Sequence, residues 1–193
     1  MTIVDSLRRA RRNSEVSLRD VAQRSGVGET NLSAIEHDRR TPTTATAERV
    51  ADALGVTFVP VSVRGRTPAA LSAAAIAAAD DSGDHRLAYR QFIQLADDLI
   101  AVDPVTRVIL SAEEPERTGK RWDDAVAALV EYRLTEAGAP LPAWVTRRQG
   151  NPDVTWEPQR SSRPLPIRAD TEKVADPFRR RGILIEENEL LSA

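Results

Sequence analysis

Two clusters of arginine side chains lie near the start of the 193-residue chain. One cluster is RRARR at residues 8–12, and the other is the pair Arg39 and Arg40. Guanidinium groups donate charge-assisted hydrogen bonds to phosphate or carboxylate oxygens. Residues 1–57 nevertheless hold nine Arg against eight acidic residues, so the basic charge is clustered rather than abundant. The formal net charge of -2 does not exclude a nucleic-acid partner, because the local sign of the charge matters more than the total.

The chain lacks some residue types that hydrolytic and metal sites need, and the others are far from one another in the sequence. Cys is absent, which excludes a disulfide scaffold, thiolate zinc sites and Cys nucleophiles. The two histidines, His37 and His85, are distant in sequence, and neither an H-E-x-x-H motif nor a Gly-rich phosphate loop occurs. The only lysines, Lys120 and Lys173, lie in polar surroundings without a serine nucleophile motif. The sequence therefore predicts that the protein is not an enzyme and needs no cofactor or metal.

Composition favours a folded protein of the cell interior. The chain is 41% apolar and 29% charged, which is ordinary for a globular protein. No apolar run approaches the ~18 residues that a membrane span needs. The first residues also lack the apolar core of a signal peptide. We therefore expect a soluble cytoplasmic protein of one domain or two small ones, without membrane contact.

Residues 1–57 predict four short helices joined by tight turns. Apolar residues repeat at helical spacing in each segment. Ser17 stands three residues before Asp20, as in a capping box, and Gly26 ends that helix. Pro42 ends the next helix, and Gly55 ends the last.

The segment LRDVAQRSGVGETNLSAIEH, residues 18–37, meets the steric requirements of a helix-turn-helix. Two helices that cross closely need a small residue at the contact, and Ala22 is placed there. The turn needs a residue that tolerates positive φ, and Gly26 follows four positions later. Leu32 and Ile35 have the spacing to pack the second helix inward.

Residues 6–56 resemble the helix-turn-helix domain of the Cro/phage-repressor (Xre-type) family. The matching pieces are LRRAR, SLRDVAQRSGV, NLSAIEHDRRTP and ERVADALGV. The resemblance implies that Gly28 opens a recognition helix. It also implies DNA base contacts by the outward residues of that helix, Glu29, Thr30, Ser33 and Ala34. The phosphate contacts that it implies are Arg8, Arg9, Arg12, Arg19, Asn31, Arg39 and Arg40.

The side chains on that outward face have definite base preferences. Glu29 can accept a hydrogen bond from cytosine N4, whereas Ala34 offers only apolar contact. Thr30 can hydrogen-bond or pack its methyl group on thymine, and Ser33 can serve a base or a phosphate.

Three positions depart from the family pattern. Leu18 stands where Gln often begins the second helix, and Asp38 stands where Gly commonly follows the recognition helix. Ala47 replaces a large aliphatic residue, which predicts a thin core for the domain.

The second half of the chain predicts further helices. Residues 58–68 are expected to form a linker or an edge strand around Pro60, before a helical domain over residues 69–193. Its helices are expected in the Ala-rich run to Ala79, after a solvated break at 80–84, and from Trp122 to about Glu136. The Pro- and Trp-rich part after Gly138 is expected to be irregular but packed, or else to be a partner-dependent tail. The predicted fold class is mainly α: a helix-turn-helix bundle of four to five helices plus this second domain, with room for short strands.

Residues 105–193 faintly resemble the C-terminal regions of bacterial helix-turn-helix antitoxins, through RWDDAVAALVEYRLTEAGAPLPAWV and DPFRRRGILIEENEL. The predicted partner-binding residues are Trp144, Trp156, Phe178, Arg179, Arg180 and Arg181. The leading hypothesis is a nucleoid-associated homodimeric repressor that binds double-stranded DNA at a palindromic operator in its own promoter. In this hypothesis the second half neutralises a cognate toxin. The alternatives are a stand-alone repressor whose second half dimerises or senses a small ligand, and a protein-interaction adaptor with a decayed helix-turn-helix.

Overall fold

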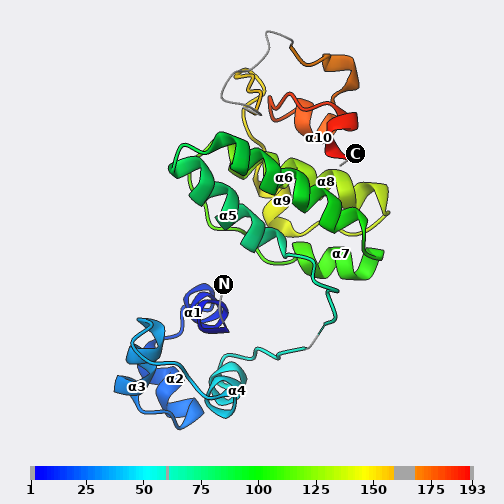
Figure 1. Cartoon of the computed structure of the whole chain (residues 1–193). Helices are drawn as coiled ribbons and strands as arrows, with labels where there is room; N and C mark the ends of the chain where they lie inside the picture. Colours follow the sequence, from blue (N-terminus) through cyan, green and yellow to red (C-terminus); the bar gives the residue numbers. More distant parts are fainter. Residues whose placement is uncertain (1–2, 60, 159–167, 192–193) are drawn as a thin grey trace. The chain divides into compact units, whose positions relative to one another are not determined.

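The chain divides into two compact units, and each is described by itself. The computed structural model describes residues 3–59, 61–158 and 168–191. Unit 1 is Met1–Val61 and unit 2 is Ser62–Ala193 (Figure 1). The described residues form α-helices and short 3-10 helices and no strand, which confirms the mainly α fold class. The short strands that the prediction allowed are reduced to two isolated β-bridges, Trp156 with Ile183 and Val174 with Glu186.

Unit 1 contains four helices, as the turn and cap residues predict. They are α1 (Ile3–Asn13), α2 (Leu18–Ser25), α3 (Glu29–Glu36) and α4 (Thr44–Ala53). The hydroxyl of Ser17 accepts a hydrogen bond from Asp20 N at 3.1 Å and starts α2. The hydroxyl of Thr43 accepts from Thr46 N at 3.2 Å and starts α4 in the same way.

The core of unit 1 is small. Its buried residues are Leu7, Val21, Val27, Leu32, Ala47, Val50 and Ala51. A cavity of about 20 Å³ remains among these side chains, and Ala47, Val4 and Ile35 are in its lining. The cavity therefore lies beside Ala47, the small residue from which a thin core is predicted.

Unit 2 is built around α8 (Arg121–Glu136), which packs against α5 (Ala69–Asp81) and α6 (His85–Ile100) (Figure 1). Residues 125–131 of α8 are all buried, because neighbouring segments cover the helix on every side. Shorter elements complete the unit: α7 (Pro104–Ser111), α9 (Ala143–Arg147), η1 (Thr171–Lys173), α10 (Asp176–Arg179) and η2 (Glu187–Leu190). The division between the two units falls within the predicted linker, residues 58–68, whose described residues form no strand.

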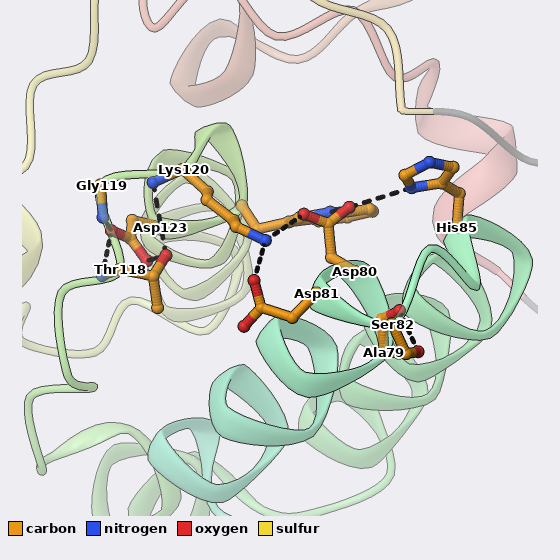
Figure 2. Close-up of polar contacts among 10 residues, drawn as sticks. Ala79, Asp80, Asp81, Ser82, His85, Thr118, Gly119, Lys120 and Asp123 are labelled. Carbon is orange, nitrogen blue, oxygen red and sulfur yellow. Dashed lines mark hydrogen bonds and ion pairs between the residues drawn. The ribbon is translucent and has the colours of Figure 1, made fainter.

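The predicted solvated break at residues 80–84 is in part a polar joint between helices, so that prediction is wrong for Asp80 (Figure 2). The Asp80 carboxylate is half-buried and accepts hydrogen bonds from Lys120 Nζ at 2.8 Å and Trp122 Nε1 at 3.3 Å. It also lies 3.1 Å from His85 Nδ1. The joint therefore ties the end of α5 to the start of α8 and the start of α6.

The described residues of the Pro- and Trp-rich segment after Gly138 pack into unit 2, as the first of the two alternatives predicts. Trp144, Phe178, Ile183 and Ile185 are buried in the same apolar core as α6 and α8. The indole Nε1 of Trp144 donates to Ser111 O at 2.9 Å, so its polar atom is also satisfied. Among the described residues, no helix has both the length and the apolar character needed to cross a membrane.

Candidate nucleic-acid interface

The helix pair α2 and α3 positions the outward face of α3. Gly26 lies between them at φ 66°, a left-handed conformation that L side chains rarely adopt. Val21 on α2 and Leu32 and Ile35 on α3 are buried, while Ala22 is half-buried against the same core. The four predicted core positions of the helix-turn-helix, Ala22, Gly26, Leu32 and Ile35, therefore lie at the packed junction or its turn.

The outward face of α3 forms one side of an open groove. Its lining residues are Leu18, Glu29, Thr30, Ser33, Ala34 and Arg39. All four predicted base-contact residues are in this set, and Glu29 and Thr30 are exposed whereas Ser33 and Ala34 are half-buried. The carboxylate of Glu29 forms no ion pair in the part of the chain that the structure describes, so it can accept from a ligand. The groove thus combines one acidic acceptor, two hydroxyl groups and the apolar side chains of Leu18 and Ala34.

Four of the predicted phosphate-binding arginines have guanidinium groups exposed to solvent. Arg12 is at the end of α1, Arg19 is in the first turn of α2, and Arg39 and Arg40 follow α3. Within residues 3–59 none of these four side chains forms an ion pair that would compete with an external anion. Each of them is available to bind phosphate.

Arg8 has a different role in the structure. Its Nη2 donates to the Glu36 carbonyl and to the Asp38 carboxylate at 3.1 Å, and its Nη1 lies 3.5 Å from the Asp5 carboxylate. Asp38 adopts φ 55° at the position where the family commonly has Gly. Arg8 therefore holds the end of α3 and its left-handed exit turn, so the structure corrects its assignment as a free phosphate contact.

The sequence analysis missed the contact between Arg11 and Glu36. Arg11 Nε and Nη2 donate to the two carboxylate oxygens of Glu36 at 2.6 Å and 2.7 Å. Hydrogen bonding to Glu36 raises the pKa of Arg11, while partial burial opposes that shift. The bidentate pair fixes α1 against the last turn of α3. Its signal was the position of Arg11 four residues after Leu7, on the buried face of α1.

Arg9 and Asn31 are less accessible than their predicted role requires. Both are half-buried, and Arg9 is engaged within the chain. The Oδ1 atom of Asn31 is buried without a hydrogen-bond partner among the described residues. Asn31 is also absent from the lining of the groove.

Comparison with known proteins agrees with this geometry. Residues 3–61 match the family model of a helix-turn-helix domain. The helix-turn-helix domain therefore comprises α1 to α4, and α3 stands in the position of its second, recognition helix. The match covers about a third of the chain and does not extend into unit 2. No curated protein and no solved structure was found to match the chain.

The predicted partner surface on unit 2 is corrected at three of its six residues. Trp144 and Phe178 are buried in the core, and Arg181 is completely buried beside Glu131. Their side chains fill the interior of unit 2 and cannot anchor a partner at its surface. Trp156 is half-buried and stacks edge-on against Trp122, while Arg179 and Arg180 are exposed.

Proposed function

We propose that the helix-turn-helix domain binds double-stranded DNA and reads base edges in the major groove with α3. The observation that carries this proposal is the groove lined by Leu18, Glu29, Thr30, Ser33, Ala34 and Arg39. Its polar atoms face solvent instead of the core, and they include both acceptors and donors that match base edges. Glu29 has no ion-pair partner among residues 3–59, 61–158 and 168–191, which supports its assignment to the N4 amino group of a cytosine.

Phosphate contacts are assigned to arginines that are exposed on the same domain. Arg39 and Arg40 follow the recognition helix, and Arg12 and Arg19 lie at the ends of the two preceding helices. Contacts of this kind fix the register of the protein on the duplex without reading its sequence. Arg8 and Arg11 act on DNA indirectly, because they hold the end of α3 that presents Arg39 and Arg40.

The test is a titration of the full chain onto the DNA upstream of its own coding sequence at several salt concentrations. Specific binding predicts a steep inverse dependence of affinity on salt, because each phosphate contact releases counterions. It also predicts tighter binding to that DNA than to a scrambled duplex of equal composition. Equal affinity for the two duplexes would overturn the proposal.

Two substitutions separate base reading from phosphate binding. Glu29→Ala is expected to relax base preference at one position, with a loss of discrimination of about 1–3 kcal/mol. Arg40→Ala is expected to weaken binding to all sequences alike and to reduce the salt slope by about one. Arg49→Ala, an exposed arginine on α4, is the matched control. Identical effects of the first two variants would contradict the assigned roles.

The finer proposal is a cytoplasmic repressor that acts as a homodimer at the nucleoid. One eight-residue recognition helix reads few base pairs, so two copies on half-sites about 34 Å apart are expected to bind a palindromic operator. Footprinting and light scattering of the complex test this expectation together. A protected site without two-fold symmetry, bound by a single chain, would contradict it.

We further propose that the repressor is the antitoxin of a toxin–antitoxin pair, with unit 2 as the toxin-binding part. Support comes from the exposed Arg179 and Arg180, from the half-buried Trp156 and from the faint resemblance of residues 105–193. The experiment is expression of the neighbouring reading frame with and without this chain. A neighbour that is harmless alone would rule out this role.

A second candidate is a stand-alone repressor whose unit 2 dimerises or senses a small molecule. The burial of Trp144, Phe178 and Arg181 favours it, because these residues are fully satisfied without a protein partner. Neither proposal assigns a catalytic activity to the chain. The two are separated by the same co-expression experiment, since only the antitoxin requires a toxic neighbour.

A further inference from the structure

Unit 2 has an open groove between the loop that precedes α8 and the segment that follows α9. Its volume is about 440 Å³. Five basic side chains line it: Arg117, Lys120, Arg121, Arg147 and Arg148. Two carboxylates, Asp123 and Asp124, are also in the lining. Whether the groove favours an anion depends on where these charges are directed.

Both carboxylates are engaged by the protein itself. Asp123 accepts hydrogen bonds from the backbone N–H groups of Thr118 and Gly119 at 2.8 Å and 2.9 Å (Figure 2). It also accepts one from the Thr118 hydroxyl at 2.9 Å. Asp124 lies 3.3 Å from Arg121, and burial raises the pKa of its carboxyl group. The charge of Asp123 still offsets part of the effect of burial, which lowers the pKa of Arg148, but neither carboxylate forms an ion pair with Arg117, Arg147 or Arg148 among the described residues.

One carboxylate outside the lining is shared by three arginines. Glu114 Oε2 lies 2.7 Å from Arg147 Nη2, and its Oε1 lies 3.5 Å from Arg148 Nη2. The same Oε1 is 3.9 Å from Arg117 Nε, beyond hydrogen-bond distance. A single negative charge cannot balance three guanidinium groups. The side chains of Arg117 and Arg147 are 63% and 58% exposed, so they can reach a ligand.

Arg148 lies buried at this wall of the groove, at only 4% exposure. Its Nη2 donates to Pro115 O, while its Nε and Nη1 have no hydrogen-bond partner in the part of the chain that the structure describes. Its guanidinium carbon is 5.1 Å from the centroid of the Trp144 ring, which gives partial compensation. A buried charge with so weak a counter-charge is costly, and an external anion nearby would reduce that cost.

We propose that this groove binds a small dianion of the phosphate class. Arg117 and Arg147 hold its oxygens by charge-assisted hydrogen bonds, and the field of the buried Arg148 attracts it from the wall behind. The free phosphate ion and the phosphate group of a small metabolite share this chemistry. The site is independent of the proposed DNA binding, because every residue in it belongs to unit 2.

The experiment is thermal unfolding of the full chain followed by tryptophan fluorescence. Trp122, Trp144 and Trp156 are the only tryptophans and all lie in unit 2, so the signal reports this unit alone. Inorganic phosphate, pyrophosphate and a phosphorylated sugar are compared with chloride at equal ionic strength and pH. We expect a rise in Tm of several degrees that saturates with phosphate or pyrophosphate concentration. A larger rise with the sugar phosphate would identify a metabolite as the ligand, and an equal rise would identify the free ion.

Substitutions distinguish a site from general screening of charge. Arg117→Gln and Arg147→Gln are exposed changes that are expected to weaken the apparent affinity for pyrophosphate at least ten-fold each. Arg179→Gln, an exposed arginine elsewhere on unit 2, is the control and keeps the full affinity. Equal Tm values in chloride and pyrophosphate would overturn the proposal, as would an equal shift in all three variants.

Arg148→Met tests the buried group. The variant removes the charge but keeps the length of the side chain, so we expect loss of most of the anion-dependent shift. If that variant does not fold, the two exposed substitutions still decide the matter. A folded Arg148→Met protein with an unchanged shift would contradict the role of Arg148.

Discussion

The two units of this protein use the same residue, arginine, in opposite ways. In the described part of unit 1 no arginine is buried, and Arg12, Arg19, Arg39 and Arg40 are exposed. In unit 2 the buried arginines are Arg107, Arg133, Arg148 and Arg181. Local charge in the sequence therefore does not tell a ligand-binding arginine from a structural one. An arginine has a structural role where the surrounding backbone has carbonyl groups that need hydrogen-bond donors.

Helix ends and irregular segments of unit 2 supply such carbonyl groups. Arg107 Nη1 donates to Arg133 O at 2.7 Å, and Arg133 Nη2 donates to Leu190 O at 2.8 Å. Arg181 Nε donates to Arg148 O at 2.7 Å. Buried carbonyls outside regular helices need partners, and the five N–H donors of a guanidinium group can satisfy several of them. The four helices of unit 1 satisfy most of their carbonyls internally, so Arg12, Arg19, Arg39 and Arg40 remain available.

The largest effect is expected for Arg181→Met. Arg181 also pairs with Glu131 at 2.8 Å, and Glu131 is itself buried. Removing the guanidinium leaves the carbonyls of Val145, Arg148 and Pro177 without their donor, and Glu131 keeps only its ion pair with Arg180. Unit 2 should therefore lose about 3–5 kcal/mol of stability. Urea unfolding followed by tryptophan fluorescence measures it. Arg179→Met, two residues away and exposed, should cost less than about 0.5 kcal/mol. Equal unfolding midpoints for the two variants would remove the contrast between the units.

The helices of unit 1 could be predicted well, because their signals act between residues that are close in the sequence. The cap at Ser17 and the turn at Gly26 act within a few residues, so spacing alone placed α2 and α3. The same kind of signal stands before α7, at Asp103 and Pro104, where the sequence analysis expects no helix of its own. In the structure Asp103 Oδ1 accepts from Val105 N and Thr106 N, each at 3.1 Å, and starts a new helix.

Contacts between segments that are distant in the sequence could not be predicted. The burial of Arg181 depends on which carbonyls the segment near Arg148 leaves open, and no periodicity records that. Arg8 looked like its basic neighbours, but its role depends on Asp38, thirty positions later. The base-contact face could be predicted, because it lies on the side of α3 opposite a regular stripe of apolar residues.

The second prediction concerns Arg11, which like Arg8 has a structural role in unit 1. The Arg11 and Glu36 side chains are 19% and 16% exposed, so their ion pair is only partly screened by water. Glu36→Gln should destabilise unit 1 by about 1–2 kcal/mol, because a partly buried guanidinium loses its charged partner. Hydrogen exchange of peptides within residues 3–59 measures this loss separately from unit 2.

The control is Glu48→Gln, an exposed change on α4 that should leave exchange unchanged. The double variant Arg11→Met/Glu36→Met should recover most of the stability, since no unpaired charge remains. If the double variant is as unstable as Glu36→Gln, the geometry of the ion pair, and not its charge balance, determines its contribution to the stability of unit 1.

The third prediction uses pH at the joint of Figure 2. Burial raises the pKa of Asp80, but hydrogen bonds from Lys120, His85 and Trp122 outweigh it and hold the pKa below its usual range. A depressed pKa stabilises the fold above the pKa of the unfolded chain, and this contribution is lost as pH falls through the folded value. Asp80→Asn should therefore cost unit 2 about 1 kcal/mol at pH 7 and progressively less below about pH 4.

Tryptophan fluorescence across that pH range provides the measurement. Asp81→Asn is the matched control, because Asp81 contacts the same Lys120 but is largely exposed. The difference in stability between Asp80→Asn and the parent protein should shrink as the pH falls. A difference that stays constant would contradict the assigned charge of Asp80.

The fourth prediction concerns Leu18, which the sequence analysis noted only as a departure from the family pattern. It lines the groove beside the recognition helix together with Ala34, and both offer apolar contact. If they pack on a thymine methyl group, replacing that thymine by uracil should weaken binding by about 0.8 kcal/mol. Uracil scanning of the operator leaves the protein unchanged, so folding cannot confuse the result. Leu18→Asn should abolish the difference between thymine and uracil, and uniform tolerance of uracil by the parent protein would remove Leu18 from the interface.

The smallest effect should come from the cavity in unit 1. Ala47→Val places two methyl groups near a void of about 20 Å³, and the gain from filling it exceeds the helix-propensity cost of a β-branched residue. We expect a net stabilisation of about 0.5 kcal/mol, measured by hydrogen exchange within residues 3–59. Ala51→Val, on the same helix but outside the cavity lining, should instead destabilise by about 1–3 kcal/mol through overpacking. Opposite signs at these two alanines would locate the weakness of unit 1 in one void. Stabilisation at both positions would mean that its small core tolerates added volume anywhere, and destabilisation at both would mean that the void cannot accept a larger side chain.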